Sequence, residues 1–394
     1  MTKEELREQT LRLCTQLIRA QSISGEENET AHVLQDAMRG LGYDEITVDR
    51  LGNVIGCIHG SKPGKRILLD GHMDTVPVKE PERWSVDPFV GELRDGRIYG
   101  RGATDMKGAL AAMTCAAAYF AARTGRGFRG DIYVAGVVYE ELFEGVACRP
   151  ISEQVQPDLV VIGEASELNL KIGQRGRAEI VVETYGKPAH SANPEKGVNA
   201  VKKMMALLSA IEKIRPQEQA GLGKGIMELT DIISSPYPGA SVVPERCTAT
   251  FDRRLLVGDT KESVLAPIQA EIDLLRAKDP TFSARVFLRE EERRCYTGDI
   301  IRAERFLPAW LFSPEEPWIQ KIYGALCTLA VPPQLTTYSF CTNGSHYAGE
   351  RAIPTVGYGP SQECLAHTVD EYVAVEQLAT AAEGYDRILS AMME

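Results

Sequence analysis

The sequence predicts an α/β protein in which a buried sheet is flanked by helices and a smaller α+β unit is inserted. Three observations predict this class. The chain has 394 residues, which is more than one hydrophobic core usually organises. Apolar strand-like runs without polar alternation occur between helical stretches, a pattern typical of a sheet covered on both faces. Near residue 176 the strands begin to alternate, which indicates a second domain.

Two helices and then a series of strands are predicted in the amino-terminal part. The first helix is expected over 3–20, where Thr2 and Glu5 fit a capping box. The second is expected over 25–39, capped by Ser24. The strand-like segments that follow are EITVD, NVIGCIHG, RILLDGH, DIYVAGVVY and DLVVIGEAS, with a long helix over about 106–123 before the fourth.

The inserted α+β unit is predicted over 176–291. The segment RAEIVVETYG alternates like a half-exposed strand, and a helix with one apolar stripe follows, with Pro194 at its start. The strand RCTATFDRRLL, a helix over 260–276 and the strand FSARVFLRE complete it. This order is typical of a split βαβ module.

The rest of the chain is expected to return to the first domain. Segments 1–175 and 292–394 together form this discontinuous domain, which ends in a helix from about residue 373. The stretch 292–317 has few hydrophobic residues in register. It is either a loop that shapes the substrate site or a packed connector.

The composition excludes several classes of function. The formal net charge of -11 argues against a nucleic-acid surface and against an anionic membrane surface. Nine cysteines without a C-x-x-C pair indicate reduced thiols, and the amino terminus does not read as a signal peptide. The longest small-apolar run, ALAAMTCAAAYFAA, is too short to span a bilayer. We therefore expect a cytoplasmic protein.

Potential metal ligands follow several of the predicted strands. His72 and Asp74 come directly after the apolar run ILL, and on an extended chain both side chains point the same way. An isolated pair of this kind is also compatible with a solvated loop. Glu140 and Glu164 lie at the ends of two further strands. Because ligands gather at the carboxyl ends of strands in such sheets, one shared site is favoured.

The number and the types of the candidate ligands indicate what kind of site this is. Of six histidines, His190 and His367 also lie among small residues and glycine or proline, whereas His32 and His59 fit structural positions in a helix and a strand. The adjacent pair Glu140-Glu141 is either a charged helix start or is neutralised by a cation. Two histidines and several carboxylates suit a two-zinc site with metals about 3.5–4 Å apart. The acidic candidates are Asp74, Asp105, Glu140, Glu141 and Glu164.

A nucleotide-binding alternative is weaker. The segment GRGATDMKG half-matches the dinucleotide fingerprint G-x-G-x-x-G, but Asp105 stands at the third glycine position. A carboxylate there occupies the place of a pyrophosphate at the helix amino terminus. No Walker loop and no Gly-x-Ser-x-Gly elbow occurs, so the sequence supports neither a P-loop NTPase nor a serine hydrolase.

Six segments together resemble the zinc-dependent aminoacylase/carboxypeptidase family, which includes acetylornithine deacetylase, succinyl-diaminopimelate desuccinylase and carboxypeptidase G2. They are GHMDTVPV, GRGATDMKG, YEEL, GEAS, AHSANPEKGVNA and AHTVDEYV, in the family's order along nearly the whole chain. The segments CTNGSHYAGERAIPTVGYGP and RFLPAWLF are similar to its selenium-metabolism-linked hydrolase subgroup. The resemblance implies a zinc-peptidase-like catalytic domain with a mixed sheet and an inserted ferredoxin-like lid and dimerisation domain.

The resemblance also implies roles for individual residues. Asp105 would bridge two metals, and a non-proline cis peptide would follow it. Glu140 would be the general base, and Asp74 would accept a hydrogen bond from the second ring nitrogen of His72. His190 would stabilise the oxyanion. The remaining ligands would be His72 and Glu164 on one metal, and Glu141 and His367 on the other.

The implied substrate contacts rest on fewer residues. Arg254 would pair with a substrate carboxylate, although Asp252, two residues away on the same strand face, is an equally good partner. Two positions depart from the family pattern, since Ser241 replaces a frequent asparagine and His346 a frequent aspartate. The residues expected to line the pocket are Asn343, Gly344, His346 and Gly359.

The sequence thus predicts a cytoplasmic, homodimeric amidohydrolase with two divalent metal ions per chain, zinc or else cobalt or manganese. It would cleave a C–N amide bond of a small carboxylate-bearing substrate, as an N-acyl amino acid deacylase or a carboxypeptidase-like enzyme. A dipeptidase of the same family is the alternative within enzymes. A metal-binding regulatory protein without turnover is the alternative outside them, and the free base Glu140 argues against it.

Overall fold

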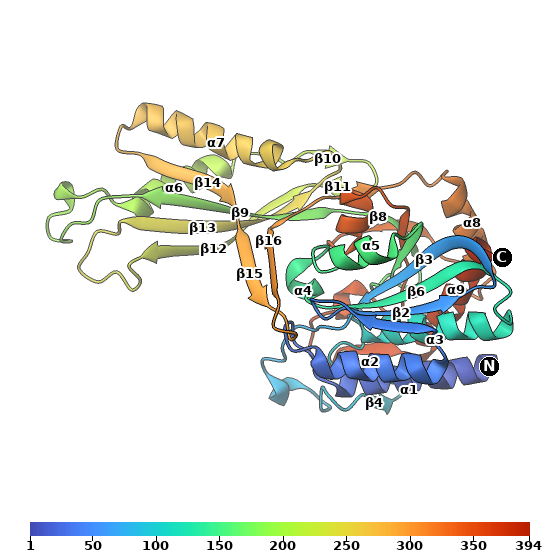
Figure 1. The fold of residues 1–394 in the computed structure, drawn as a ribbon. Coiled ribbons are helices and arrows are strands. Elements are labelled where there is room, and N and C mark those ends of the chain that lie inside the picture. Colours follow the sequence, from blue (N-terminus) through green and yellow to red (C-terminus); the bar gives the residue numbers. More distant parts are fainter. The chain divides into compact units, whose positions relative to one another are not determined.

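The computed structural model describes residues 1–394, and the chain divides into two compact units (Figure 1). The first unit consists of Met1–Gln174, Glu292–Arg302 and Trp310–Glu394. The second consists of Arg175–Glu291 and the short segment Ala303–Ala309, which we had expected in the first. This segment groups with the second unit because its strand β17 (Phe306–Leu307) pairs with β9 (Gly176–Tyr185).

A mixed nine-stranded sheet forms the centre of the first unit. Its four middle strands β6, β3, β7 and β20 are parallel neighbours, so their carboxyl ends meet at one edge. The outer strands include antiparallel partners, as in β2 with β6 and β20 with β8. The strands are β1 (Glu45–Val48), β2 (Val54–His59), β3 (Lys62–His72), β6 (Arg129–Val137), β7 (Leu159–Ile162), β8 (Leu170–Gln174), β18 (Trp310–Leu311), β19 (Leu335–Tyr338) and β20 (Thr355–Gly357).

Helices cover the sheet, and the central one is α3 (Lys107–Arg123). Almost every residue of α3 is buried, and it packs against α1, α9 and β3, because its many alanines allow close approach of neighbouring backbones. None of the helices is long and apolar enough to cross a membrane. The other helices of this unit are α1 (Lys3–Arg19), α2 (Asn28–Leu41), α4 (Glu140–Phe143), α5 (Arg149–Val155), α8 (Pro317–Leu326) and α9 (Val375–Met393).

The two amino-terminal helices test the predicted caps. The capping box of Thr2 and Glu5 is confirmed at α1. The cap predicted for the second helix is wrong, since α2 begins at Asn28 and has no side-chain cap. The Ser24 hydroxyl instead donates a hydrogen bond to the Asp74 carboxylate at 2.7 Å. A residue distant in the sequence therefore binds the side chain that the sequence pattern assigned to the helix cap.

The second unit has the connectivity of a ferredoxin-like domain. Its antiparallel sheet has the order β12-β13-β9-β14, and the helices α6 and α7 separate the strands in a βαββαβ sequence. Apolar residues of both helices and of the sheet form a common core. The elements are β9 (Gly176–Tyr185), α6 (Ala200–Ile211), β12 (Ile226–Ser235), β13 (Arg246–Leu255), α7 (Lys261–Lys278) and β14 (Ser283–Leu288).

Two expectations for this part of the chain are wrong. Pro194 lies in a short 3-10 turn, and α6 begins only at Ala200, where the side chain of Asn199 accepts from the backbone N–H of Lys202. The stretch 292–317 is not irregular, since it holds short strands. These are the end of β15 (Glu290–Arg294), β16 (Ile300–Glu304), β17 and β18.

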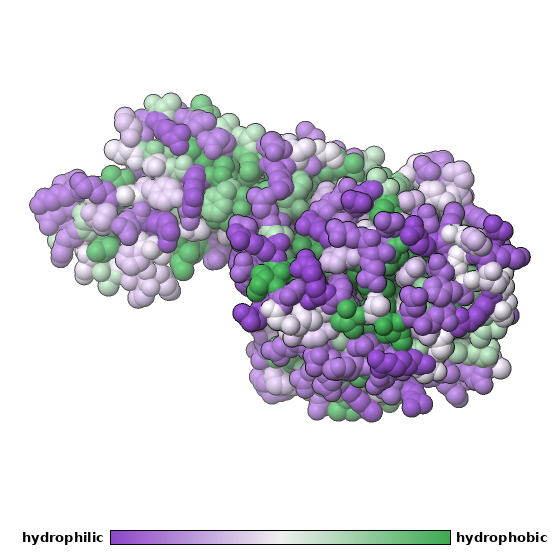
Figure 2. Space-filling model, viewed as in Figure 1, coloured by the Kyte–Doolittle hydropathy of each residue, from purple (hydrophilic) through white to green (hydrophobic).

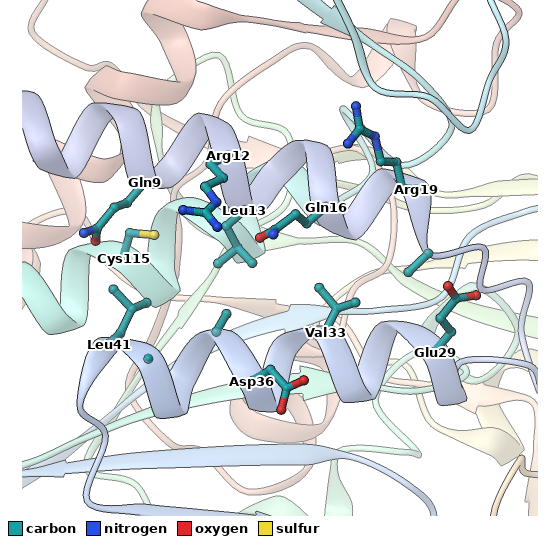
Figure 3. Close-up of a pocket in the computed structure, with 13 residues that line it drawn as sticks. Gln9, Arg12, Leu13, Gln16, Arg19, Glu29, Val33, Asp36, Leu41 and Cys115 are labelled. Atoms are coloured by element: carbon teal, nitrogen blue, oxygen red, sulfur yellow. The ribbon is translucent and has the colours of Figure 1, made fainter.

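The surface in view is mostly hydrophilic, and hydrophobic residues appear there as separate patches (Figure 2). A hollow of about 570 Å³ lies between α1 and α2 (Figure 3). Its lining combines apolar residues such as Leu13 and Val33 with charged ones such as Arg12 and Asp36. None of the residues expected in the catalytic site lines it.

Candidate metal centre

Three neighbouring parallel strands deliver potential ligands to one edge of the sheet. His72 is the last residue of β3, and Glu164 follows β7 after one further residue. Glu140 and Glu141 open α4 directly after β6, where Tyr139 adopts a left-handed φ of 56° that turns the chain. Because β6, β3 and β7 lie side by side and parallel, these side chains converge on one place.

Asp105 and His367 reach this place from two loops that are joined by a small sheet. In that sheet β21 (Tyr372–Ala374) pairs with β5 (Arg97–Tyr99), which pairs with β4 (Glu92–Arg94). The loop of His367 precedes β21, and the loop of Asp105 follows β5, so the pairing places the two loops together. The peptide bond Asp105-Met106 is cis, as the family resemblance implies.

The convergent side chains form two groups that share Asp105. In the first group, His72 Nε2 lies 2.9 Å from Asp105 Oδ1 and 3.6 Å from Glu164 Oε1. In the second, His367 Nε2 lies 3.1 Å from Asp105 Oδ2 and 2.9 Å from Glu141 Oε2. Each oxygen of Asp105 thus faces a different histidine. This is the arrangement that a carboxylate bridging two cations requires.

The acids of the centre are too crowded to ionise together. Burial, together with the charge of Glu164, raises the pKa of Glu140 well above its usual range. Burial and the charge of Asp105 raise the pKa of Glu141 to about 7 and that of Glu164 well above normal. Without cations, burial and mutual repulsion therefore favour the protonated forms of these three acids.

The neighbouring carboxylates favour the positively charged forms of His72 and His367. Burial alone would lower the pKa of His72, but the hydrogen bond with Asp105 and the charge of Glu164 raise it well above normal. Asp105 and Glu141 raise the pKa of His367 to about 10. Burial would raise the pKa of Asp105, yet its two histidine partners hold it well below the usual range. The site therefore attracts positive charge.

The donor set fits divalent cations of the zinc class. Imidazole nitrogen and carboxylate oxygen are ligands that zinc accepts. In addition, Oε1 of Glu140 and Oε1 of Glu141 are buried without a hydrogen-bond partner. A buried carboxylate oxygen without a partner carries a large desolvation cost unless a cation or a proton meets it.

Asp74 is placed differently from the expectation. His72 Nδ1 lies 2.8 Å from the backbone carbonyl oxygen of Asp74 and 3.6 Å from its carboxylate. The carboxylate instead accepts from the backbone N–H of Glu140 at 2.9 Å and of Glu141 at 3.2 Å. Asp74 thus orients the ring of His72 through its backbone, and its carboxylate fixes the start of α4.

Asn343 and Gly344, which were expected to line the pocket, contact other residues of the first unit. Asn343 is buried, and its side-chain amide donates to Asp70 and accepts from the backbone N–H of Gly145, both at 2.9 Å. A Cβ at Gly344 would lie 2.7 Å from Nε1 of Trp310, so only glycine fits there without a shift. These contacts give Asn343 and Gly344 a supporting place in the fold.

His346 and Gly359 are the two other positions that were expected at the pocket. His346 is buried, its Nδ1 lies 2.7 Å from Glu350 Oε2, and its Nε2 has no hydrogen-bond partner. Gly359 lies against the backbone that carries Glu164, since a Cβ there would come within 2.5 Å of the Glu164 carbonyl oxygen. A side chain at this position would therefore displace a residue of the metal centre.

His190 and Arg254 belong to the second unit. His190 is exposed, and its Nδ1 accepts from the backbone N–H of Ala192. Arg254 Nε lies 3.0 Å from Asp252 Oδ1, which is the neutralising partner that the sequence offered as the alternative to a substrate carboxylate.

A buried ion pair beneath Asp105 was missed by the sequence analysis. Glu371 is fully buried, and one of its oxygens accepts from the backbone N–H groups of Thr104 and Asp105, at 2.9 and 3.1 Å. Its other oxygen pairs with the guanidinium of Arg101. The segment AHTVDEYV contains this glutamate, but nothing in its spacing distinguishes a support from a ligand.

We expect Arg101→Met to lower the free energy of unfolding by about 3–5 kcal/mol, because it leaves the Glu371 carboxylate buried without a counter-charge. Urea denaturation of the metal-free protein measures this change. The exposed pair of Lys3 and Glu383 provides the matched control, and Lys3→Met should change the free energy of unfolding by less than about 1 kcal/mol. Equal effects of the two substitutions would contradict a supporting role for the buried pair.

Comparisons with known proteins give the following matches. Residues 68–391 match the family described as Peptidase family M20/M25/M40. An uncharacterised protein, YgeY of Escherichia coli (strain K12), is 30% identical over 383 residues, covering 96% of this chain and 93% of YgeY. Succinyl-diaminopimelate desuccinylase 2 of Ruegeria sp. (strain TM1040) is 28% identical over 391 residues, with the same two coverages.

The fold also matches a solved structure. The YXEP protein of Bacillus subtilis, described as a dinuclear metal binding peptidase, superposes with a TM-score of 0.70. Its sequence is 14% identical, and the match covers 98% of this chain and 99% of that one. At this identity the likeness concerns the fold alone.

Proposed function

Because the chain belongs to peptidase family M20/M25/M40, a family of metal-dependent hydrolases, we propose that it hydrolyses a C–N amide bond with two divalent metal ions per chain. The observation that carries this proposal is the shared position of Asp105, whose two oxygens face the two histidines of different ligand groups. The groups would be His72, Asp105 and Glu164 for one ion, and Asp105, Glu141 and His367 for the other.

Zinc is the metal we propose, with cobalt or manganese as substitutes. When bound, two such ions supply the Lewis acidity that polarises the scissile carbonyl and acidifies an attacking water. Asp105, whose two oxygens face different histidines, would be a ligand of both ions. The carboxylate of Asp74 fixes the backbone of Glu140 and Glu141, so the base and one ligand move as a single unit.

Glu140 is the proposed general base. Its Oε1 is buried and has no partner in the fold, so it is available to the reacting water. Glu140 would accept a proton from the water as the water oxygen bonds to the carbonyl carbon, and would pass that proton to the leaving nitrogen as the C–N bond breaks. The carboxylic acid that is released gives its remaining proton to the amine, so the products are a carboxylate and an ammonium group, and the carboxylate of Glu140 is regenerated.

The substrate class follows from the family resemblance and from polar groups that remain unsatisfied. We propose a small amide that bears a carboxylate, with Nε2 of His346, which is buried without a hydrogen-bond partner, as a donor to the substrate. His190 and Arg254, in the second unit, would bind the oxyanion and the carboxylate. Arg254 would have to exchange Asp252 for the substrate.

A substrate screen tests this proposal. The metal-loaded full chain is assayed with N-acyl amino acids and with dipeptides, and release of a free amine is measured. Faster turnover of N-acyl amino acids than of dipeptides supports a deacylase, and faster turnover of dipeptides supports a dipeptidase. Absence of turnover on both sets, with two ions bound, would favour a metal-binding regulatory protein.

We further propose a homodimer that forms through the second unit. Strand β12 is the outer strand of its sheet, and Leu229, Ile232 and Ile233 on it are 39%, 49% and 49% exposed. A long apolar edge strand is a template for pairing with another strand. An identical strand of a second copy would continue the sheet and cover these side chains.

Charge on this edge should therefore separate the copies. We expect the double substitution Ile232→Glu with Ile233→Glu to raise the dimer dissociation constant at least tenfold, which is a change of about 1.4 kcal/mol. Sedimentation equilibrium measures it. Leu274→Glu, at a 53% exposed leucine on α7, is the matched control and should leave the dimer intact. A wild-type monomer, or equal effects of both variants, would refute the edge-strand interface.

A further inference from the structure

A second group of metal-binding side chains lies on the sheet of the first unit, among residues that the proposed hydrolysis does not use. Cys57 and His59 are two residues apart on β2, so their side chains share one face. In the antiparallel pairing of β2 with β6, His59 stands opposite Asp131 and Cys57 opposite Tyr133. The register therefore gathers a thiol, an imidazole and a carboxylate on the same face.

This group is separate from the candidate metal centre. Asp131 lies near the amino end of β6, whereas Glu140 and Glu141 follow its carboxyl end. The six residue steps from Asp131 to Val137, the end of β6, extend roughly 20 Å. His59 and Asp131 line a surface hollow of about 650 Å³, which gives a solute access to them.

The three ligand atoms lie close enough together to share one ion, and the sulfur and nitrogen have the separation of a tetrahedral zinc site. Cys57 Sγ lies 3.6 Å from His59 Nδ1, which lies 2.8 Å from Asp131 Oδ1, and all three atoms are within 4.8 Å of one another. A zinc ion with sulfur at about 2.3 Å and nitrogen at about 2.0–2.1 Å places those two ligand atoms about 3.6 Å apart. The sulfur and nitrogen already have this separation.

A fourth residue orients the imidazole for this role. Glu45, on the neighbouring strand β1, has Oε1 3.4 Å from Nε2 of His59. A carboxylate at one ring nitrogen holds the proton there and leaves the lone pair of the other nitrogen for a metal. The lone pair of Nδ1 then points to the side where Cys57 and Asp131 lie.

Negative charge surrounds the thiol. Burial first, and then the charges of Asp131 and Glu45, raise the pKa of Cys57 to about 12, although a hydrogen bond with Tyr133 opposes this. Asp131 and Glu45, which lie beside His59, would also attract a cation to this place. A sulfur ligand also selects zinc-like ions over magnesium or calcium.

We propose that Cys57, His59 and Asp131 bind one zinc-like divalent cation at the amino end of β6, with Glu45 as the positioning residue of His59. Solvent in the adjoining hollow supplies the fourth ligand. The cation would tie β2 to β6, so it is a structural site, and it takes no part in the proposed hydrolysis. The competing arrangement is an ion pair of protonated His59 with Asp131 and Glu45, in which Cys57 binds nothing.

Cobalt(II) distinguishes the two arrangements, because only a sulfur ligand produces a thiolate-to-cobalt charge-transfer absorption in the near ultraviolet. The proposed catalytic ligands contain only nitrogen and oxygen. We expect the metal-depleted full chain to develop this absorption as cobalt is added, up to one thiolate-bound ion per chain, and Asp105→Asn to retain it. Cys57→Ser should abolish it. Glu45→Gln should weaken the cobalt affinity that it reports by about 10–100-fold.

Two further variants keep the test decisive. The side chain of His59 is 44% exposed, so His59→Gln tests the imidazole at a position where the fold tolerates change, and it should also remove the absorption. Cys364→Ser removes an exposed thiol elsewhere and should leave it intact. A cobalt-loaded wild type without the absorption would overturn the proposal. So would an absorption that survives His59→Gln or disappears with Cys364→Ser.

Discussion

Glu140→Gln should lower kcat by at least about 10³-fold while the metal content per chain stays unchanged. General acid–base catalysis contributes about 10²–10⁴-fold, and an amide cannot accept the proton of the attacking water. Glutamine keeps the size of the side chain, and the backbone N–H of residue 140 still reaches Asp74. The measurement pairs steady-state kinetics on the best substrate of the screen with elemental analysis of the same samples.

The neighbouring buried acid Glu144 is the matched control, since Glu144→Gln makes the same chemical change four residues later. It should leave kcat within about tenfold of the wild-type value, because a nearby charge only modulates the base. If Glu140→Gln kept more than about a tenth of the activity, the base would have to be another group. If it lost its metal, Glu140 would be a ligand.

In a Cys57→Ser background, which lacks the third proposed metal site, Asp105→Asn should remove both ions of the metal centre and with them all measurable turnover. Each oxygen of Asp105 faces a different ligand group, so a neutral amide weakens both groups at once. Loss of bound metal also lowers stability, and we expect the metal-dependent rise in melting temperature to disappear. Elemental analysis after gel filtration, together with circular dichroism to verify the fold, measures the outcome.

His367→Ala is the informative comparison for this variant. His367 belongs to only one group, and its side chain is 51% exposed, so its removal should cost one ion and spare the ion at His72 and Glu164. In that background, a stepwise pattern of two ions without further substitution, one with His367→Ala and none with Asp105→Asn would support a shared bridge. Loss of a single ion in both variants would argue for two independent sites.

The placement of the metal-centre residues could be anticipated because it depends on local rules. A strand that ends in His72, or in the turn before Glu140, presents these residues at its carboxyl end wherever the strand lies in the sheet. Parallel pairing then brings the ends together. Three of the four sheet strands and both helices of the second unit could likewise be predicted from their periodicity.

What sequence reasoning missed depends on partners that are distant along the chain. Ser24 looks like a helix cap, but its hydroxyl bonds to Asp74. Strand β12 was not predicted, because both of its faces are largely exposed and its sequence therefore lacks a clear apolar alternation. The pair of Arg101 and Glu371 joins two loops, and no spacing rule reveals that a glutamate supports the backbone of Asp105.

The discontinuous first unit has a consequence for how the chain is made. Strand β7 pairs on one side with β3, but its other neighbour, β20, is translated only after the whole inserted unit. A ribosome adds roughly 5–20 residues per second, so the apolar edge of β7 stays open for on the order of ten seconds. Most of the inserted unit, with its own core, is complete before that edge is covered. His367 emerges later still, so a nascent chain carries an aggregation-prone edge until its metal ligands are nearly all synthesised.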